Sequence, residues 1–471
     1  MNLTDRSKYH RIHFTGIKGV GMTALAIVAR EMGIAVSGSD ISEEFPTDAT
    51  LKRFHIPYAT GFSELNIAAG TDLIIYTGAH QGSKNPEVFA AKMRNIPVMP
   101  HGRALGLFME GSRGISVAGS HGKTTTSAMV ATVLVKSGRD PSYAIGCGEI
   151  LGLGTSGHAG KGEFFVAEAD EYMTEPGADA TPRFLWQKPE LLIITNIDFD
   201  HPDAYADLNA VKQAFLTFIN GLAVNATIVL NQDDPPSASL LPLIKHKVVT
   251  YGLKKTAQFQ LVNLMFHEGR TNFSVKFPDT KVHEFELVVP GAHNAVNATA
   301  VIAGLTNLQI SLEEIKNRLA AFRGTRRRFE LILEKDGKLM FDDYAHHPKE
   351  IRATLNSCRD WYGKRRLIVI FQPHTYSRTL ALLPEFAESF TQADTVLVTE
   401  IYASQRETKR GDVSGRHLTE AIKKHQEEVY FVPQKSDVLE YVRSNVRPGD
   451  LIMTMGAGNI YNWIPEIAAL L

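Results

Sequence analysis

The chain has 471 residues, which is too long for one ordinary hydrophobic core and fits about three domains of the usual size. Hydrophobic residues make up 44% of it, as in globular proteins, and the formal net charge of −1 excludes a sequence-wide attraction to nucleic acid or acidic membranes. Cys147 and Cys358 lie far apart without CxxC spacing, so neither a zinc site nor a disulfide framework is indicated.

The beginning of the chain lacks an apolar signal core, and no run approaches the ~18 apolar residues of a membrane span. We therefore expect a soluble, cytoplasmic protein with small-molecule ligands and no nucleic-acid or membrane partner. We expect a monomer or a homodimer.

The first predicted unit is a βαβ arrangement. A strand over residues 11–14 leads into a glycine turn, Gly16 to Met22, followed by a helix over 23–31 and a second strand that ends in Asp40. Such a turn lets the backbone approach a diphosphate at a helix N-terminus, and the acidic residue can hold a ribose hydroxyl. The GxxGxG spacing departs from the GxGxxG dinucleotide pattern, so a nicotinamide cofactor is disfavoured without being excluded, and a plain turn remains an alternative.

Further strands are expected at residues 72–77 and 96–99, with a helix starting at Asn85-Pro86-Glu87 between them. The second domain should begin near Gly111. The first domain is therefore predicted to span residues 1–110.

The stretch Gly119 to Thr125 follows the apolar run Ile115–Ala118 and opens a helix-like run over 127–135. Strand, glycine loop and helix together are typical of a triphosphate cradle, in which Lys123 reaches the outer phosphates and the Thr124 hydroxyl faces a magnesium ion. The eight-residue P-loop pattern would place glycine where this chain has Val117, so the match is to a shortened form. A glycine turn without ligand is the alternative.

Two later apolar runs end in polar clusters. Residues 164–167 precede Glu168-Ala169-Asp170-Glu171, and residues 191–196 precede Asp200-His201-Pro202. Parallel strands place their carboxyl ends at one edge of a sheet, so Glu168 and His201 are candidates for the same metal ion as Thr124. Magnesium prefers oxygen ligands, so His201 could act through water. A solvated strand end and a turn are the alternatives.

The rest of the second domain, which we place at residues 111–325, contains a helix at 215–222 and a strand at 226–231. Alternating residues over 259–289 favour short antiparallel strands. Asn294 enters an alanine-rich helix, where its amide can face an adenine edge or cap the helix.

Residues 326–471 are predicted to be a third, α/β domain with strands at 366–371, 395–399 and 451–455. It opens with Arg326-Arg327-Arg328, which suits phosphate contact, although a solvated charge run is the default. Histidine and arginine at strand ends, in the motifs 342–348 and 371–379, can hold a small carboxylate and its amine.

Taken together these motifs resemble the Mur ligases, the ATP-dependent amide-forming enzymes of peptidoglycan precursor synthesis. Within the family, the pattern is most similar to the members that join L-alanine to UDP-N-acetylmuramate. The stretches that carry the resemblance are 16–22 with 37–40, 119–126, 168–171, Asn196 with Asp200-His201, His293-Asn294, 327–329, 342–348 and 371–379.

The resemblance implies an α/β fold of three domains: a Rossmann-like UDP-sugar domain, a central P-loop ATPase-like domain with a mostly parallel sheet, and a C-terminal Rossmann-like domain that binds the amino acid. It also implies ATP and Mg²⁺ as cofactors, with UDP-N-acetylmuramate and L-alanine as substrates.

The resemblance further assigns roles to individual residues. The UDP-sugar contacts are Gly16, Gly19, Val20, Gly21, Met22, Ser39 and Asp40; the ATP contacts are Gly119, Ser120, His121, Gly122, Lys123, Thr124, Thr125, Asn294, Arg328 and Asp343; the amino-acid contacts are Tyr344, His346, His374 and Arg378; the metal ligands are Thr124, Glu168 and His201; and the catalytic residues are Lys123, Glu168, His201, Arg328, His374 and Arg378.

In the mechanism that the family implies, the substrate carboxylate attacks the γ-phosphate to form an acyl phosphate, and the amine then displaces phosphate. Three departures from the family pattern concern Lys18, Tyr172 to Pro176, and Thr375. They leave open a recycling ligase that attaches the ready-made tripeptide L-Ala-γ-D-Glu-diaminopimelate. A P-loop switch protein and a nicotinamide dehydrogenase are alternatives from other classes.

Overall fold

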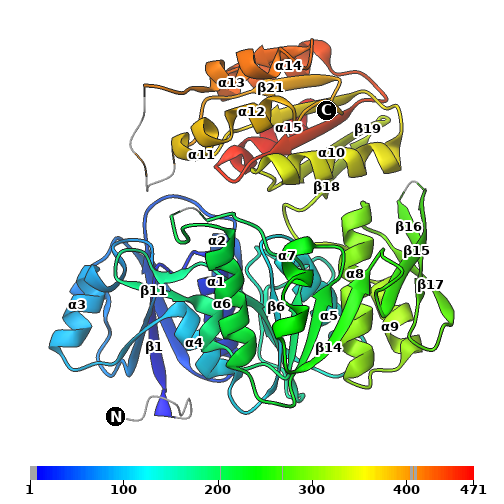
Figure 1. The fold of residues 1–471 in the computed structure, drawn as a ribbon. Coiled ribbons are helices and arrows are strands. Elements are labelled where there is room, and N and C mark those ends of the chain that lie inside the picture. Colours follow the sequence, from blue (N-terminus) through cyan, green and yellow to red (C-terminus); the bar gives the residue numbers. More distant parts are fainter. Residues whose placement is uncertain (1–7, 202, 268, 404–406, 408–410) are drawn as a thin grey trace. The chain divides into compact units, whose positions relative to one another are not determined.

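The computed structural model describes residues 8–201, 203–267, 269–403, 407 and 411–471 (Figure 1). Pro202 of the predicted Asp200-His201-Pro202 turn lies outside these residues. The chain divides into two units. The first contains Met1–Leu264, Asn272–Leu287 and Asn294–Thr325, and the second contains Met265–Thr271, Val288–His293 and Arg326–Leu471.

The first unit begins with a five-stranded parallel sheet in the order β3-β2-β1-β4-β5. Its strands are β1 (Arg11–Thr15), β2 (Ala35–Asp40), β3 (Tyr58–Thr60), β4 (Leu73–Tyr76) and β5 (Val98–Pro100). Its helices are α1 (Val20–Glu31), α2 (Asp48–Arg53), η2 (Glu64–Asn66), η3 (Gly82–Lys84), α3 (Pro86–Met93) and α4 (His101–Met109). The predicted βαβ start and the helix start at Asn85 are confirmed; Asn85 caps α3 by accepting the Glu87 N–H.

The same unit continues into a ten-stranded sheet in the order β17-β16-β15-β14-β13-β12-β6-β9-β7-β8. All pairs from β15 to β7 are parallel, and β8 is antiparallel to β7. The strands are β6 (Arg113–Ala118), β7 (Ser142–Ala144), β8 (Gly157–His158), β9 (Phe164–Ala169), β12 (Leu191–Ile194), β13 (Thr227–Asn231), β14 (Lys247–Gly252), β15 (Phe259–His267), β16 (Arg270–Lys276) and β17 (Val282–Leu287). The central strands β6, β9 and β12 are almost fully buried, as expected for a parallel sheet between helices.

The helices associated with this sheet are α5 (Lys123–Lys136), α6 (Leu208–Asn220), α7 (Pro235–Ala238), η5 (Leu241–Leu243), α8 (Ala292–Asn307) and α9 (Leu312–Leu319). Helix α5 packs against β6, β9 and α9. A small two-stranded sheet, β10 (Met173–Glu175) with β11 (Asp179–Pro182), and the short helix η4 (Arg183–Trp186) lie between β9 and β12 in the chain and were not predicted.

The two sheets of the first unit share a hydrophobic core. Helix α1 contacts both β7 and β8, and the core that surrounds it includes Phe165 and Ala167 of β9. Gly157 is required here because a Cβ atom at this position would lie 2.1 Å from the Ala24 carbonyl oxygen. The first two predicted domains therefore lie in one packed unit.

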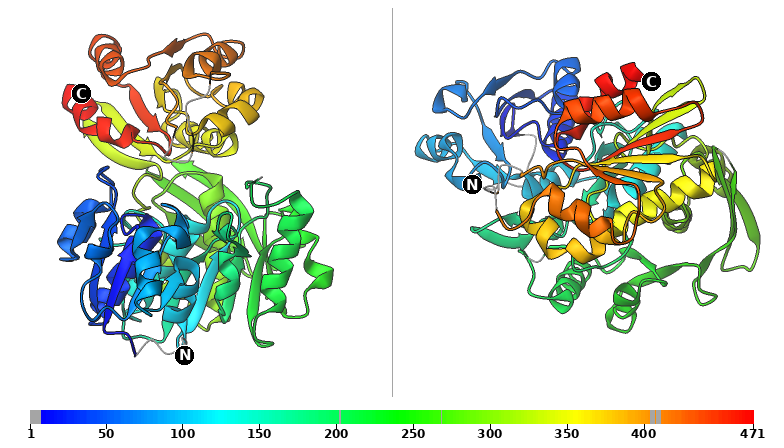
Figure 2. Two further views of the ribbon diagram at one scale, coloured as in Figure 1. Left: turned by 90° about the vertical axis from the view of Figure 1, so that its left-hand side faces the viewer. Right: turned by 90° about the horizontal axis from the view of Figure 1, so that it is seen from above.

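The second unit contains a six-stranded sheet in the order β18-β19-β23-β20-β21-β22, parallel except for the antiparallel pair β18 with β19. Its strands are β18 (Glu330–Lys335), β19 (Lys338–Asp343), β20 (Leu367–Phe371), β21 (Thr395–Val398), β22 (Val429–Phe431) and β23 (Leu451–Met455), and its helices are α10 (Pro348–Tyr362), α11 (Tyr376–Ala381), α12 (Leu383–Ala387), α13 (Gly415–Ile422), α14 (Lys435–Asn445), η6 (Ile460–Trp463) and α15 (Ile464–Leu470). Helices lie on both faces of this sheet (Figure 2). Two separate hydrophobic clusters fill the space on these two faces. The predicted α/β character is confirmed.

Among the described residues, no helix has the length and apolar character needed to cross a membrane. Cys147 and Cys358 are both buried and reduced.

Candidate active site

The predicted phosphate cradle joins β6 to α5. Gly122 precedes the first helical residue with φ +83°, a left-handed conformation that favours glycine. The chain segment after β12 braces the loop, because the Asn196 side chain accepts the His121 N–H at 2.9 Å and donates to the His121 carbonyl oxygen at 2.9 Å. The Ser120 hydroxyl accepts the Asp198 N–H at 2.8 Å. The loop is therefore preorganised at the N-terminus of α5.

Lys123 is the first residue of α5 and is directed into this loop. Its ammonium group donates to the Gly119 carbonyl oxygen at 2.5 Å and lies 2.9 Å from Glu171 Oε2. Burial alone would lower the pKa of Lys123, but the carboxylates of Glu171 and Asp170 more than offset this effect, so the pKa is raised. Lys123 is thus held as a cation.

The structure brings two of the three predicted metal ligands together. The Thr124 side chain interacts with the Glu168 carboxylate, which accepts the Gly146 N–H at 2.9 Å. Burial raises the pKa of Glu168, and Lys123 and Thr124 only partly compensate. Both groups offer oxygen atoms, the ligand type that Mg²⁺ prefers.

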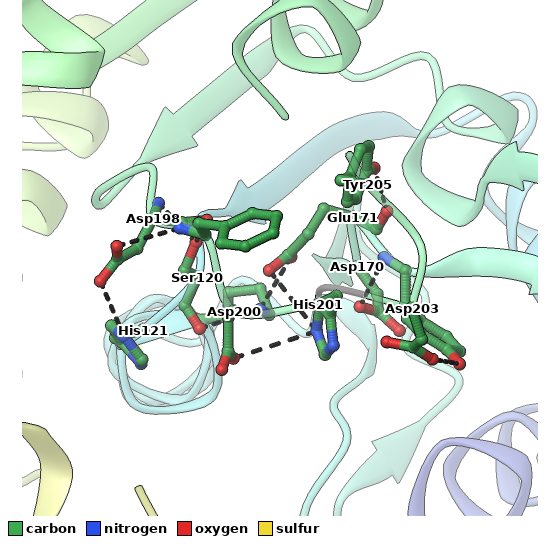
Figure 3. A network of polar contacts seen from close by, with 12 residues as sticks. Ser120, His121, Asp170, Glu171, Asp198, Asp200, His201, Asp203 and Tyr205 are labelled. Atoms are coloured by element: carbon green, nitrogen blue, oxygen red, sulfur yellow. Dashed lines mark hydrogen bonds and ion pairs between the residues drawn. The ribbon is translucent and has the colours of Figure 1, made fainter. Parts of the chain in front are cut away.

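The third predicted ligand, His201, lies beside a different carboxylate. Its Nε2 atom is 4.0 Å from Glu171 Oε1 and 4.0 Å from Asp200 Oδ2, and its ring packs on Tyr172 with 4.9 Å between centroids (Figure 3). No group of three or more His, Cys, Asp or Glu residues with metal-binding geometry occurs in the part of the chain that the structure describes. The contacts of the described residues link His201 to the cradle through Glu171, which also contacts Lys123.

Two residues at the end of β9 extend this network. Asp170 accepts a hydrogen bond from the Arg183 guanidinium at 2.8 Å. Burial alone would raise the pKa of Asp170, but Arg183 and Lys123 lower it overall. Glu171 is 1% exposed, and the Tyr205 hydroxyl donates to its backbone carbonyl oxygen. Its Oε1 atom has no hydrogen-bond partner among the described residues, which suits a buried carboxylate beside a cation site.

Helix α8 also faces the cradle. Asn294 lies in its first turn and is 8% exposed. A Cβ atom at Gly122 would lie 3.0 Å from Asn297 Oδ1, one helical turn further along α8. Asn297 was not predicted, although its i, i+3 spacing from Asn294 could have indicated it.

The first glycine turn lies between β1 and α1. Gly16 has φ +82°, and its N–H donates to the Ser39 carbonyl oxygen at 2.9 Å. Gly19 precedes α1 and Gly21 contacts His101, whose pKa is lowered to about 4 by burial and by Arg183. Val20 is exposed and Met22 is buried within α1.

The side chains of two predicted sugar-nucleotide contacts, Ser39 and Asp40, are buried and hydrogen-bonded to other groups of the protein. The Ser39 hydroxyl is fully buried and donates to Glu87 at 2.5 Å. Asp40 is 1% exposed, and its carboxylate accepts the N–H groups of Lys18 at 2.7 Å and Ile41 at 2.8 Å. Asp40 therefore supports the backbone of the glycine turn through Lys18, and Ser39 is bonded to Glu87 in the protein interior.

Lys18, one of the departures from the family pattern, does not extend from the turn. Its ammonium group donates to the carbonyl oxygens of Ile41 at 3.1 Å and Glu43 at 2.9 Å and lies 3.2 Å from Asp48. Its side chain fastens the segment after β2 to the turn.

In the second unit, the predicted ATP contacts Arg328 and Asp343 lie near the end of β19. Asp343 accepts the N–H groups of Phe329 at 2.7 Å and Ala345 at 2.8 Å, and burial raises its pKa to about 6. The Arg328 guanidinium lies 5.3 Å from the Tyr344 ring centroid and 3.7 Å from Glu350. Asn294 belongs to the other unit.

The predicted amino-acid contacts form one aromatic cluster. The His346 ring meets those of Tyr344 and His374 edge-on, at 5.2 and 6.0 Å, and Arg378 donates to His374 Nδ1 at 3.3 Å. Burial lowers the pKa of His346. Tyr402, which was not predicted, stacks on His374 with 6.0 Å between centroids. A neutral imidazole beside a guanidinium suits an amine and a carboxylate.

Three Mur ligase family models match consecutive parts of the chain: the Mur ligase family catalytic domain over residues 11–113, the Mur ligase middle domain over 117–305 and the Mur ligase glutamate ligase domain over 327–458. The chain is also 40% identical over 451 residues to a UDP-N-acetylmuramate–L-alanine ligase of Desulfitobacterium hafniense, covering 96% of this chain and 97% of the relative. The chain belongs to the Mur ligase family.

Other relatives agree with this assignment. A UDP-N-acetylmuramate–L-alanine ligase of Geobacter sulfurreducens is 40% identical, covering 96% of both chains. The crystal structure of UDP-N-acetylmuramate-alanine ligase from Thermotoga maritima superposes with a TM-score of 0.83 at 30% identity, covering 98% of both chains. A MurF ligase from Thermotoga maritima in complex with ADP shares the fold, with a TM-score of 0.61 at 15% identity over 92% of this chain and 94% of that one.

The predicted α/β Mur ligase fold with three family domains is therefore confirmed. Membership of this ligase family leaves the P-loop switch and the nicotinamide dehydrogenase without support.

Proposed function

We propose that this Mur ligase joins L-alanine to the carboxylate of UDP-N-acetylmuramate at the expense of ATP, in the cytoplasm, as a step of peptidoglycan precursor synthesis. The observation that carries the proposal is a preorganised phosphate cradle, with Lys123 at the N-terminus of α5, in a chain 40% identical over 96% of its length to ligases of this name.

The cradle residues Gly119 to Thr125 would hold the triphosphate, with Lys123 on its outer phosphates. The sugar carboxylate then attacks the γ-phosphorus atom, the bond to ADP breaks, and an acyl phosphate forms. The amine of L-alanine adds to the acyl carbon, a proton leaves the nitrogen, and inorganic phosphate departs. The protein contributes positioning and fixed positive charge rather than a covalent intermediate of its own.

The oxygen atoms of Thr124 and Glu168 fit a magnesium ion. Lys123, the residue before Thr124, contacts Glu171, and Glu171 in turn lies 4.0 Å from His201. Bound there, Mg²⁺ would neutralise charge on the phosphates. We assign Gly16 to Met22 to the UDP-sugar, Asn294, Arg328 and Asp343 to ATP, and Tyr344, His346, His374 and Arg378 to L-alanine. We also propose that the three functional domains span residues 1–110, 111–325 and 326–471.

The test is a product analysis. The protein is incubated with UDP-N-acetylmuramate, Mg-ATP and either single amino acids or the tripeptide L-Ala-γ-D-Glu-diaminopimelate, and the products are weighed by mass spectrometry. We expect the L-alanine adduct, with ADP release that requires both the sugar nucleotide and the amino acid. ADP formed equally well without either substrate would refute the ligase assignment. Formation of the tripeptide adduct in place of the L-alanine adduct would identify the tripeptide, not L-alanine, as the substrate that is joined to the sugar nucleotide.

A further inference from the structure

The sugar-nucleotide site contains a histidine that the sequence did not indicate. In the sheet order β3-β2-β1-β4-β5, the direction of winding reverses between β1 and β4, and ligands of such sheets bind where the strands on either side of that reversal end. Gly16 follows β1, and His80 follows β4. A Cβ atom at Gly16 would lie 3.4 Å from His80 Cδ2, so the imidazole lies against the glycine turn at this point.

His80 is backed by the carboxylate that was expected to face the ligand. His80 Nε2 lies 3.5 Å from Asp40 Oδ1. The Asp40 carboxylate already accepts two backbone N–H groups and its side chain is 2% exposed, whereas the His80 side chain is 19% exposed. Of the two partners, the imidazole is therefore the one that solvent and ligands can reach.

The backbone that carries His80 is held in an unfavourable conformation. His80, Gln81 and Gly82 are all left-handed, with φ of +52°, +70° and +50°. Non-glycine residues adopt this conformation uncommonly, and strained backbone of this kind is frequent at ligand sites. Here the Asn85 side chain donates to the His80 carbonyl oxygen at 3.0 Å.

The second restraint comes from the unpredicted strand β10. Glu175 Oε1 accepts the Ser83 N–H at 2.7 Å and the Ser83 hydroxyl at 2.6 Å. It lies so close to the chain that a Cβ atom at Gly82 would be 2.4 Å from the same oxygen. Two segments far apart in the sequence thus cooperate to fix the position of His80.

We propose that His80 binds the diphosphate of the sugar nucleotide, with Asp40 and Glu175 as positioning residues behind it. The inference rests on the proposed function, which places that diphosphate at the Gly16 turn and the N-terminus of α1. Lys18 does not supply positive charge there, because its ammonium group is committed to Ile41, Glu43 and Asp48. The His80 imidazole lies beside the Asp40 carboxylate at this turn, and an imidazole N–H can donate a hydrogen bond to a phosphate oxygen.

The test is calorimetric titration of the full-length protein with UDP-N-acetylmuramate, UDP and uridine, without ATP, so that binding is measured apart from turnover. We expect His80→Ala to weaken both diphosphate ligands by about tenfold or more and to leave uridine within about twofold. His80→Gln should be intermediate, because its side-chain amide keeps a hydrogen-bond donor but not the ring that positions it. His55→Ala is the matched control, since His55 is an exposed histidine with the same φ of +52° outside the site.

The outcomes separate the two proposals. A wild-type protein that does not bind UDP-N-acetylmuramate would overturn the proposed function and the inference with it. Wild-type binding together with unchanged UDP affinity in His80→Ala would overturn the inference alone, and equal losses for UDP and uridine would overturn the diphosphate assignment.

The positioning role of Glu175 has its own readout. Glu175→Ala removes the acceptor of three hydrogen bonds, two from Ser83 and one from the Tyr76 hydroxyl, and should lower the affinity for UDP relative to uridine, which a general loss of stability would not do. Glu175→Gln retains an acceptor oxygen and should recover most of the UDP affinity. An unchanged ratio of UDP to uridine affinity in a folded Glu175→Ala protein would overturn the link between β10 and His80.

Discussion

The two glycine turns of the first unit each contain a lysine, but the two ammonium groups point in different directions. Lys123 is the first residue of α5, so its side chain returns over the cradle and its ammonium group lies among the loop carbonyl oxygens beside Glu171. Lys18 precedes the residue that caps α1, and its ammonium group is directed away from the turn to the carbonyl oxygens of Ile41 and Glu43.

The difference lies in the position of each lysine relative to the helix N-terminus. A lysine inside the first turn shares the space in front of the helix with any bound anion, whereas a lysine before the cap can be recruited by the next strand. The same residue type in similar glycine-rich sequence is therefore expected to bind a ligand in one turn and to stabilise the protein in the other.

The largest expected effect is the loss of turnover in Lys123→Ala. Because Lys123 supplies fixed positive charge at the outer phosphates, we expect turnover to fall by at least about 10²- to 10³-fold. The calorimetric affinity for UDP-N-acetylmuramate should stay within about twofold. Lys136→Ala, on the exposed last turn of the same helix, is the control and should behave as wild type. Loss of sugar-nucleotide binding in a folded Lys123→Ala protein would contradict the separation of the two sites.

Neutralising the partner of Lys123 sharpens the comparison. Glu171→Gln leaves a buried ammonium group without its closest carboxylate, which should lower the free energy of unfolding by about 3 kcal/mol. Phosphate oxygens of bound ATP would take the place of that carboxylate. We therefore expect ATP or a non-hydrolysable analogue to raise the melting temperature more in Glu171→Gln than in wild type, and an equal or smaller rise would be evidence against a direct contact between Lys123 and the nucleotide.

Much of the first unit could be predicted because its signals are local. Apolar runs, glycine turns and the Asn85 cap fix β1, α1, β6, α5 and α3, and each was placed within a few residues. The sequence could not reveal the Glu171 link to Lys123 and His201, because an acidic cluster at a strand end does not indicate which carboxylate will be buried. It also could not reveal His80 or Glu175, because the left-handed segment depends on contacts 92 residues apart in the chain.

Lys18→Met tests the claim that Lys18 stabilises the folded protein and does not bind a ligand. Removing the ammonium group leaves the carbonyl oxygens of Ile41 and Glu43 without their donor, and we expect the free energy of unfolding to fall by about 1–3 kcal/mol. The KM for ATP should be unchanged, since no contact links Lys18 to the cradle in the described structure. The measurements are urea unfolding and steady-state kinetics; a raised KM for ATP with unchanged stability would reverse the roles assigned to the two lysines.

The smallest effect is expected for Asp48→Asn, the counterpart of Glu171→Gln. Asp48 lies 3.2 Å from the Lys18 ammonium group, but its side chain is 22% exposed and two backbone carbonyl oxygens also accept from that lysine. Asp48 also accepts the Phe45 N–H at 2.7 Å and the Tyr58 hydroxyl at 2.6 Å, and asparagine keeps one oxygen acceptor for these donors, so we expect the free energy of unfolding to fall by about 1 kcal/mol. Urea unfolding without ATP measures the loss of stability in Asp48→Asn, and urea unfolding with ATP measures how much the nucleotide stabilises the variant and the wild type. If ATP raised the stability of Asp48→Asn more than that of wild type, as expected for Glu171→Gln, the nucleotide would have to reach the first turn, and the distinction between a ligand-binding and a structural lysine would fail.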